Sequence, residues 1–137
     1  MKYLLLFLAI LGIVAASLAL REHYRTDGDA PCDINERWDC GIVNHSPYAT
    51  LAGIPVAAIG IAGYLLMGVL AFLRSYRLLL IPTFAGLAFS LYLANIEAHV
   101  LGVWCVYCAI SLGIISVMSL LTLGAVVSQF VRKPRPA

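Results

Sequence analysis

Residues 100–131 read VLGVWCVYCAISLGIISVMSLLTLGAVVSQFV, which is 32 consecutive positions without a charged side chain. An uncharged, largely apolar run of about 18 residues or more is long enough to form a transmembrane helix. This run is longer than one crossing needs, so part of it should form a loop or lie at the membrane interface. It carries the tetrapeptide Cys-Val-Tyr-Cys at residues 105–108. The stretch therefore predicts a membrane helix that begins beside two cysteines.

Three further uncharged runs have spanning length, at residues 3–20, 48–73 and 78–96. Of the 137 residues, 62% are hydrophobic and 12% are charged, against about 45–50% and 25% in a soluble domain. So short a chain has no core large enough to bury this apolar surface. We predict an all-α integral membrane protein, a four-transmembrane-helix bundle forming one domain over residues 1–137. Its expected spans are approximately 3–20, 50–73, 78–97 and 104–130, with one long extracytoplasmic loop at 21–49.

The first run has a second interpretation, as a cleaved signal peptide. Lys2 provides a basic start, and Ala15 and Ala16 are the small residues typical of a cleavage site. The run is longer than the apolar region of about 7–15 residues found in such peptides. Because three more spans follow, we favour an uncleaved first helix.

The distribution of charge predicts the orientation in the membrane. With a cytoplasmic N-terminus, six basic residues lie inside, and these are Lys2, Arg74, Arg77, Arg132, Lys133 and Arg135. The three other basic residues and every acidic residue then lie outside. An excess of Lys and Arg in cytoplasmic segments is the usual pattern of membrane proteins. We therefore expect a multi-pass protein of the cell membrane with both termini in the cytoplasm.

The four cysteines form two pairs that this topology places on the same, extracytoplasmic face. Cys32 and Cys40 lie in the outer loop, and Cys105 and Cys108 lie at the outer start of the fourth span. Disulfides persist in such an oxidising compartment. Helix positions i and i+3 are neighbours, so a Cys-x-x-Cys pair closes and opens a disulfide with little backbone movement.

A reactive cysteine pair at the edge of the bilayer lies within reach of a lipid-soluble two-electron acceptor, and a loop pair lies within reach of proteins outside the cell. This arrangement predicts a thiol:quinone oxidoreductase in which the loop pair passes electrons to the membrane pair. Two alternatives stay open. One is a structural zinc site, although the Cys32–Cys40 spacing is too wide for a zinc knuckle. The other is a non-catalytic membrane scaffold whose disulfides only brace the loop.

The order of these motifs resembles the vitamin K epoxide reductase family, in particular its bacterial single-domain members. The resemblance rests on CDINERWDC at residues 32–40, followed by Ser46, by Gly-Ile-Pro at 53–55 entering the second span, and by Cys-x-x-Cys opening the fourth. It covers most of the chain. Other bacterial quinone-linked disulfide oxidases also have four helices, but their Cys-x-x-Cys comes first.

The resemblance implies a mechanism. A secreted thioredoxin-fold protein attacks the loop disulfide at Cys32, Cys40 then attacks Cys105, and Cys108 reduces the quinone. Ser46 matches a family Ser or Thr thought to assist the transfer. The electron acceptor is a quinone, ubiquinone or menaquinone, and no metal is implied. Many bacterial members carry a fused thioredoxin-like domain, and since none follows here, we expect the partner to be a separate protein.

The residues that contact the quinone are less clearly marked. Vertebrate members hold the quinone oxygens with an Asn and a Tyr, whose positions here are Val56 and Leu112 in an ungapped alignment. Neither donates a hydrogen bond, which weighs against vitamin K epoxide as substrate. Tyr107 is a candidate for stacking on the quinone or for an interfacial aromatic belt. Asn95 is a candidate polar ligand, although helix packing explains it equally well.

Glu97 and His99 end the third span close to Cys105 in the predicted topology. Ionisable groups at membrane depth are often functional, and one reading makes this pair the proton donor to the reduced quinone. We favour the other reading, in which both side chains reach the interface and meet water, because charges at helix ends do so at little cost.

Overall fold

The computed structural model describes residues 2–24, 47, 50, 51 and 53–131. Four α-helices make up most of this part of the chain, and they are α1 (Lys2–His23), α3 (Val56–Phe72), α4 (Tyr76–Ile96) and α5 (Val106–Val131). A π-helical turn, η2 (Glu97–Leu101), continues α4. A two-stranded antiparallel hairpin, β1 (Thr50–Leu51) and β2 (Ile54–Pro55), precedes α3. The described part of the protein is therefore all-α apart from this short hairpin.

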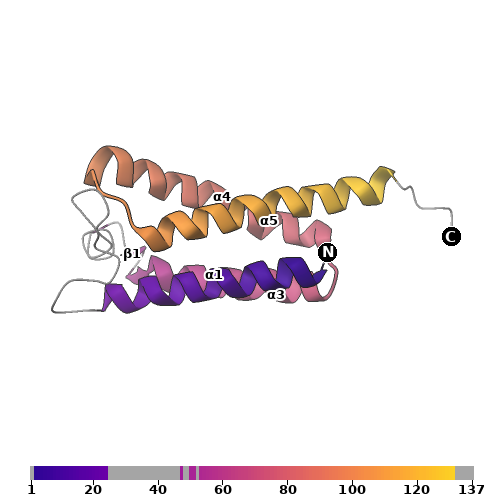
Figure 1. Ribbon diagram of the computed structural model, residues 1–137, viewed down its shortest axis with the longest axis horizontal. Coiled ribbons are helices and arrows are strands. Elements are labelled where there is room, and N and C mark those ends of the chain that lie inside the picture. The colour runs from indigo at the N-terminus through magenta and orange to yellow at the C-terminus, as the bar shows by residue number, and fades with distance from the viewer. Residues whose placement is uncertain (1, 25–46, 48–49, 52, 132–137) are drawn as a thin grey trace.

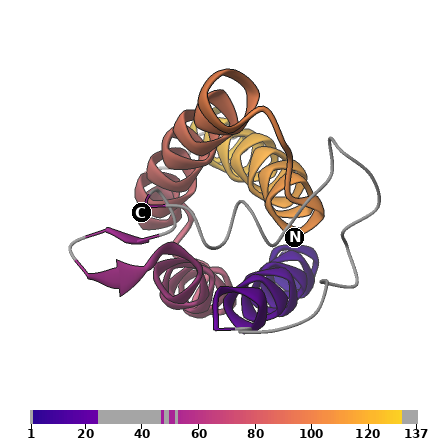
Figure 2. The ribbon, with the colours of Figure 1, turned by 90° about the vertical axis from the view of Figure 1, so that its left-hand side faces the viewer.

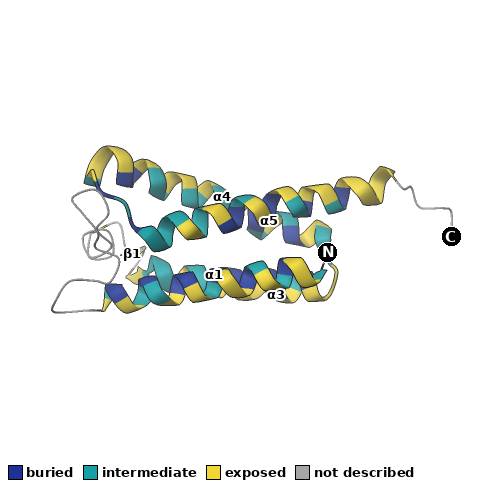
Figure 3. Ribbon diagram, in the orientation of Figure 1, coloured by how far each residue is buried: buried dark blue, intermediate teal, exposed yellow. Residues whose placement is uncertain are grey.

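The four helices form a closed ring of neighbours. α1 packs against α3 and α5, and α4 packs against the same two helices, as the end-on view in Figure 2 shows. Large apolar side chains such as Phe7, Leu66 and Leu120 are exposed, and exposed positions recur along all four helices in Figure 3. An apolar outer surface of this extent needs a lipid environment, where helices satisfy their own backbone hydrogen bonds.

The helices differ in length. Among the described residues, α1, α5 and the continuous segment of α4 and η2 are long and apolar enough to cross a membrane. α3 is also apolar but has 17 residues, which corresponds to about 25 Å of helix against a hydrocarbon core of about 30 Å. The protein is thus a multi-pass, all-α membrane protein with one helix shorter than the others.

α3 begins later than the apolar run that predicted it. Thr50–Leu51 pairs with Ile54–Pro55 in the hairpin, and Gly53 has a φ of 84°. Pro55 precedes the first helical residue, Val56. A proline has no N–H to donate, and this position requires none because the first N–H groups of a helix have no partner within it. The sequence pattern showed that the run at residues 48–73 is apolar, but it did not predict that the residues before Val56 are extended.

Figure 1 shows which segments meet at each end of the bundle. The end of α1, the hairpin, η2 and the start of α5 lie together at one end, called here the cysteine end because Cys105 and Cys108 lie there. The N-terminus, the turn between α3 and α4, and the end of α5 lie at the opposite end. Both points where the segment 25–46 joins the described residues therefore lie at the cysteine end.

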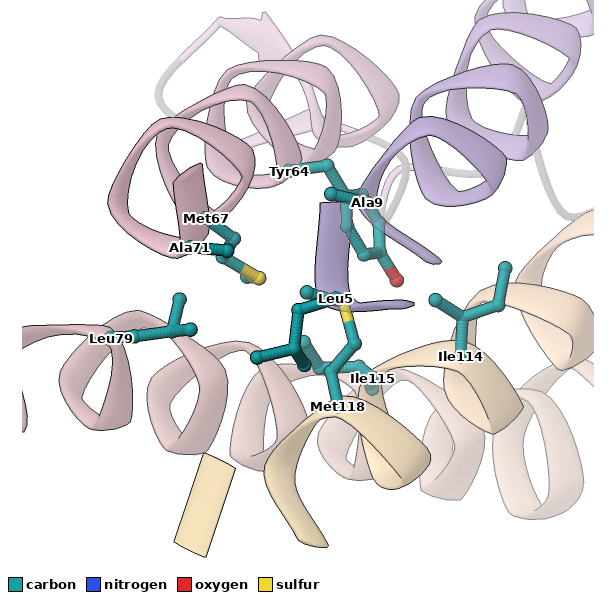
Figure 4. Packing of buried hydrophobic residues seen from close by; sticks show 9 residues of the cluster. All are labelled: Leu5, Ala9, Tyr64, Met67, Ala71, Leu79, Ile114, Ile115 and Met118. Atoms are coloured by element: carbon teal, nitrogen blue, oxygen red, sulfur yellow. The ribbon is translucent and has the colours of Figure 1, made fainter. Parts of the chain in front are cut away.

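The bundle is densely packed towards the end opposite the cysteines. Figure 4 shows the core there, formed by apolar side chains from all four helices: Leu5, Ala9, Tyr64, Met67, Ala71, Leu79, Ile114, Ile115 and Met118. Small residues bring α1 and α3 together, since a Cβ added at Gly68 would lie 3.4 Å from the Cβ of Ala9. Close approach through small residues is the usual way in which membrane helices associate.

Buried hydroxyl groups also connect α4 with α5. The Ser119 hydroxyl donates to the Thr83 carbonyl oxygen over 3.2 Å, and the Thr83 hydroxyl donates to the Leu79 carbonyl oxygen over 3.0 Å. Thr83 follows Pro82, which lies inside α4 and lacks an N–H. Hydroxyl hydrogen bonds of this kind hold a helix together near a proline and link it to its neighbour.

Candidate active site

The cysteine end of the bundle is hollow. A cavity of about 620 Å³ lies between the later half of α1, the first half of α3, α4 with η2, and the first half of α5. Its lining is mainly apolar and includes many small residues, such as Ala16, Gly60 and Gly86. Tyr64, Met67 and Ile115 belong both to the lining and to the core below. The packed core therefore forms the floor of the cavity.

The two cysteines stand where the chain enters α5. Gly102 ends η2 with a φ of 71°, a left-handed conformation that glycine adopts without steric cost. The chain then turns back, and the Ala109 N–H donates to the Cys105 carbonyl oxygen over 3.0 Å. Cys105 thus immediately precedes the first residue of α5, and Cys108 lies within its first turn, as the tetrapeptide predicted. Both are thiols in the structure.

The environments of the two thiols differ. Cys108 lines the cavity and is partly exposed. Cys105 is fully buried in a small apolar cluster with Val103 and does not line the cavity. The Cys105 and Cys108 side chains are within hydrogen-bonding contact of each other. The pair therefore has one sulfur at the cavity wall and one behind it.

A carboxyl group adjoins this pair. Glu97, the first residue of η2, is only 3% exposed and lines the cavity. The Cys108 thiol and the Cys105 backbone N–H donate hydrogen bonds to its carboxylate. His99, two residues further on, is exposed. The structure thus separates the two residues, because His99 lies at the surface while Glu97 lies inside, contrary to our expectation that both would meet water.

The model of the vitamin K epoxide reductase family matches residues 3–123, a range that covers most of the chain and includes every cysteine. The chain belongs to this family. It is accordingly a membrane oxidoreductase, since the vitamin K epoxide reductase family consists of quinone-dependent disulfide oxidoreductases.

Two apolar positions correspond to quinone contacts in other members of the family. Val56 and Leu112, which correspond by the ungapped alignment to the polar quinone contacts of vertebrate members, both line the cavity. Tyr107 also lines it, beside Trp104. These three positions of the expected quinone site are therefore brought together with Cys108 around a single space.

Asn95 does not belong to this group. It is exposed and is not among the residues that line the cavity. Ser90 and Ala94, one helical turn apart, share the face of α4 that lines the cavity. Asn95 lies about 100° around the helix from Ala94 and faces elsewhere. The polar residue that α4 presents to the cavity is Ser90.

Three expected site residues, Cys32, Cys40 and Ser46, lie outside the described residues. The zinc hypothesis is not tested for the same reason. Within the described ranges, no three His, Cys, Asp or Glu side chains gather as metal ligands would, but two of the four cysteines are not among them.

Several cavity residues were not singled out from the sequence. The Tyr64 hydroxyl reaches across from α3 to Ser111 on α5, and His23, at the end of α1, also lines the cavity. Ser111 lies three positions after Cys108, which on a helix is the same face one turn away. That spacing is the signal that identifies Ser111 as a neighbour of the reactive thiol.

Proposed function

We propose that this protein oxidises the thiols of secreted thioredoxin-fold proteins and passes the two electrons to a quinone in the bilayer. The observation that carries the proposal is the position of Cys108, in the first turn of α5 and at the wall of a largely apolar cavity inside a membrane bundle. A cavity of about 620 Å³ is within the usual range for small-molecule sites, roughly 300–1,000 Å³.

The lining suits a quinone. Apolar side chains accommodate the ring faces and the start of an isoprenoid tail, while a few polar groups remain for the ring oxygens. Val56 and Leu112 donate no hydrogen bond, so the polar groups available in the described lining are Tyr64, Ser90, Ser111, Trp104, Tyr107, His23 and Glu97. We propose that the ring lies between Cys108 and the Tyr64–Ser111 pair.

The proposed relay uses the difference between the two sulfurs. A thiolate of the protein substrate attacks the Cys32–Cys40 disulfide at Cys32, which releases Cys40. Cys40 attacks the Cys105–Cys108 disulfide at Cys105, which releases Cys108. The second thiol of the substrate then displaces Cys32, and Cys32 re-forms its disulfide with Cys40, which frees Cys105. The reduced 105/108 pair then reduces the quinone through Cys108. Ser46 is proposed to assist the transfer. The similarity to the family and the position of Cys108, rather than Cys105, at the cavity wall support this order.

The proposed topology places both termini in the cytoplasm and all four cysteines at the extracytoplasmic face. Lys2, Arg74 and Arg77 lie at the end opposite the cysteines, and these basic residues support this orientation. α3 is proposed to cross the membrane despite its length, because it runs beside α1 and is joined to α4 by a short turn. A short helix is accommodated by local thinning of the bilayer at modest cost.

The direct test uses purified protein, a short-chain ubiquinone analogue and a reduced thioredoxin-fold substrate. We expect quinone reduction in step with substrate oxidation, and its loss in Cys105→Ser and Cys108→Ser. Cys32→Ser should lose activity with the protein substrate but keep activity with a small thiol that reaches the membrane pair directly. Full turnover by Cys108→Ser would rule out the proposal.

A redox titration of the 105/108 pair tests the alternative of a non-catalytic scaffold. Structural disulfides in secreted proteins have potentials below about −300 mV, whereas catalytic disulfides are more oxidising. We expect the more oxidising value for this pair.

A further inference from the structure

Glu97 is a buried carboxyl group whose position the relay above does not explain. It is 3% exposed, at the junction of α4 and η2, and it lies at the wall of the same cavity as Cys108. Burying a carboxyl group is unfavourable unless its hydrogen bonds to water are replaced. A membrane protein retains such a group mainly where it serves a purpose.

The contacts of Glu97 point to the reacting sulfur. Its carboxylate accepts hydrogen bonds from the Cys108 thiol and from the Cys105 N–H, while its Oε1 atom has no hydrogen-bond partner among the described residues. One part of the carboxyl group is thus engaged with the cysteine pair, and one oxygen remains for another partner. A group in contact with the thiol and bordering the cavity is able to exchange a proton with either.

The regular spacing of α4 explains why Glu97 faces inward while His99 does not. Glu97 lies four positions after Leu93 and seven after Ser90, which both line the cavity, and His99 lies about 200° around the helix from Glu97. The π-helical turn that continues α4 begins at Glu97 itself, so it redirects only the residues that follow. Such a turn shifts the direction of the following side chains relative to a regular helix, and π-helical turns occur often at functional sites. Here the first residue of the turn is buried against the cysteines and the third is exposed.

We infer that Glu97 is a catalytic residue that takes the proton from the Cys108 thiol and delivers it to the quinone. This inference rests on the proposed function. Oxidation of two thiols to one disulfide releases two electrons and two protons. The Cys108 S–H bond breaks, its proton moves to the Glu97 carboxylate, and an S–S bond forms between Cys105 and Cys108 as two electrons pass to the quinone. Glu97 returns its proton to one oxygen of the resulting hydroquinone, and the proton from Cys105 goes to the other.

Other titratable groups border the same cavity. In the described lining they are His23 on α1, Tyr64 on α3, and Tyr107 on α5. Among the residues that the structure describes, the Cys108 thiol has hydrogen-bonding contacts with Glu97 and Cys105. The structure therefore favours Glu97 over these groups as the first proton acceptor.

The test is a single-turnover measurement on the full-length protein with Glu97→Gln. Protein with its cysteines fully reduced is mixed with the short-chain ubiquinone analogue, and quinone reduction is followed from acidic to alkaline pH. General acid–base catalysis contributes about 10²–10⁴-fold to a rate, so we expect a loss of 100-fold or more at neutral pH. The deficit should shrink at alkaline pH, where solvent removes the thiol proton.

Two controls make the result specific. Glu97→Asp keeps a carboxylate and should recover part of the rate. His99→Gln changes an exposed titratable group of the same turn and should match the wild-type rate and pH profile. Binding of the analogue, measured by quenching of tryptophan fluorescence, should be unchanged in Glu97→Gln, which shows that the variant is folded and that only the transfer is impaired.

The two proposals fail in different ways. A wild-type rate and an unaltered pH profile in Glu97→Gln, with Cys108→Ser inactive, would overturn the role of Glu97 and leave the relay intact. Equal losses at every pH would also overturn it, since the carboxylate would then have only a structural role. Activity in Cys108→Ser would remove the relay itself.

Discussion

The hydroxyl oxygen of Tyr64, on α3, lies 2.7 Å from Oγ of Ser111, on α5, and 3.0 Å from the Ser111 carbonyl oxygen. This contact spans the ring of helices at the level where the packed core ends and the cavity begins. It joins two helices that are not neighbours in that ring.

The two partners should contribute unequally to stability. Tyr64→Phe removes both contacts, whereas Ser111→Ala leaves the carbonyl acceptor in place. We expect Tyr64→Phe to lower the free energy of unfolding by about 1–2 kcal/mol and Ser111→Ala by about 0.5–1 kcal/mol. Reversible unfolding in mixed micelles measures both, with Ser128→Ala, at an exposed position of α5, as control. A larger loss for Ser111→Ala than for Tyr64→Phe would contradict this account.

Gly12 makes room for the Tyr64 ring. A Cβ at this position of α1 would collide with ring atoms of Tyr64, so Gly12→Ala should cost about 1–3 kcal/mol, as overpacking usually does. Gly124→Ala is the matched control, because nothing lies within 4 Å of a Cβ there. The effect of Gly12→Ala should diminish when Tyr64 is also replaced by Ala. If it persists unchanged, the collision is not its cause.

Gly63 tests whether the cavity is the quinone site. It lines the cavity, and a Cβ there would meet nothing closer than the Met67 methyl carbon at 4.0 Å. Gly63→Leu should therefore fold normally but fill space needed by the ring, and we expect KM for the quinone analogue to rise at least tenfold. Gly124→Leu, outside the cavity, should leave KM unchanged. An unaltered KM in Gly63→Leu would place the site elsewhere.

The orientation predicts which positions react with a membrane-impermeant maleimide in intact cells. In a background with all four native cysteines changed to Ser, His99→Cys and Arg77→Cys introduce exposed thiols at opposite ends of α4 with η2. We expect labelling of His99→Cys in intact cells, and of Arg77→Cys only after the membrane is permeabilised. The reverse pattern would show that the protein is inserted the other way round.

The sequence identifies the membrane helices because exclusion of charge from a bilayer is a strong constraint. It does not show which side of each helix faces inward. In a soluble helix, alternating polar and apolar faces reveal this, but these helices are apolar all round. That is why the sequence suggested Asn95 as the polar ligand on α4, whereas the polar residue of α4 that lines the cavity is Ser90.

The sequence also did not predict that Glu97 is buried. Its place at the end of a span favoured exposure, since carboxylates at helix ends usually reach water. Glu97 lies seven positions after Ser90 and continues the face of α4 that lines the cavity, and an apolar helix has no polar face to mark that side in the sequence. In contrast, the ungapped positions Val56 and Leu112 did lead to the cavity wall, because the spacing from Cys108 to Leu112 is fixed by one continuous helix.

The bundle has a dense half and a hollow half, and residues in the two halves should tolerate substitutions differently. Changes among the tightly interlocked side chains around Leu79 and Met118 cost folding energy directly. Changes among the small side chains around the hollow mostly reshape empty space. Under the proposed function, substitutions in the hollow half would change which acceptor fits while the dense half keeps the framework folded, so laboratory selection for new acceptors should begin in the hollow half.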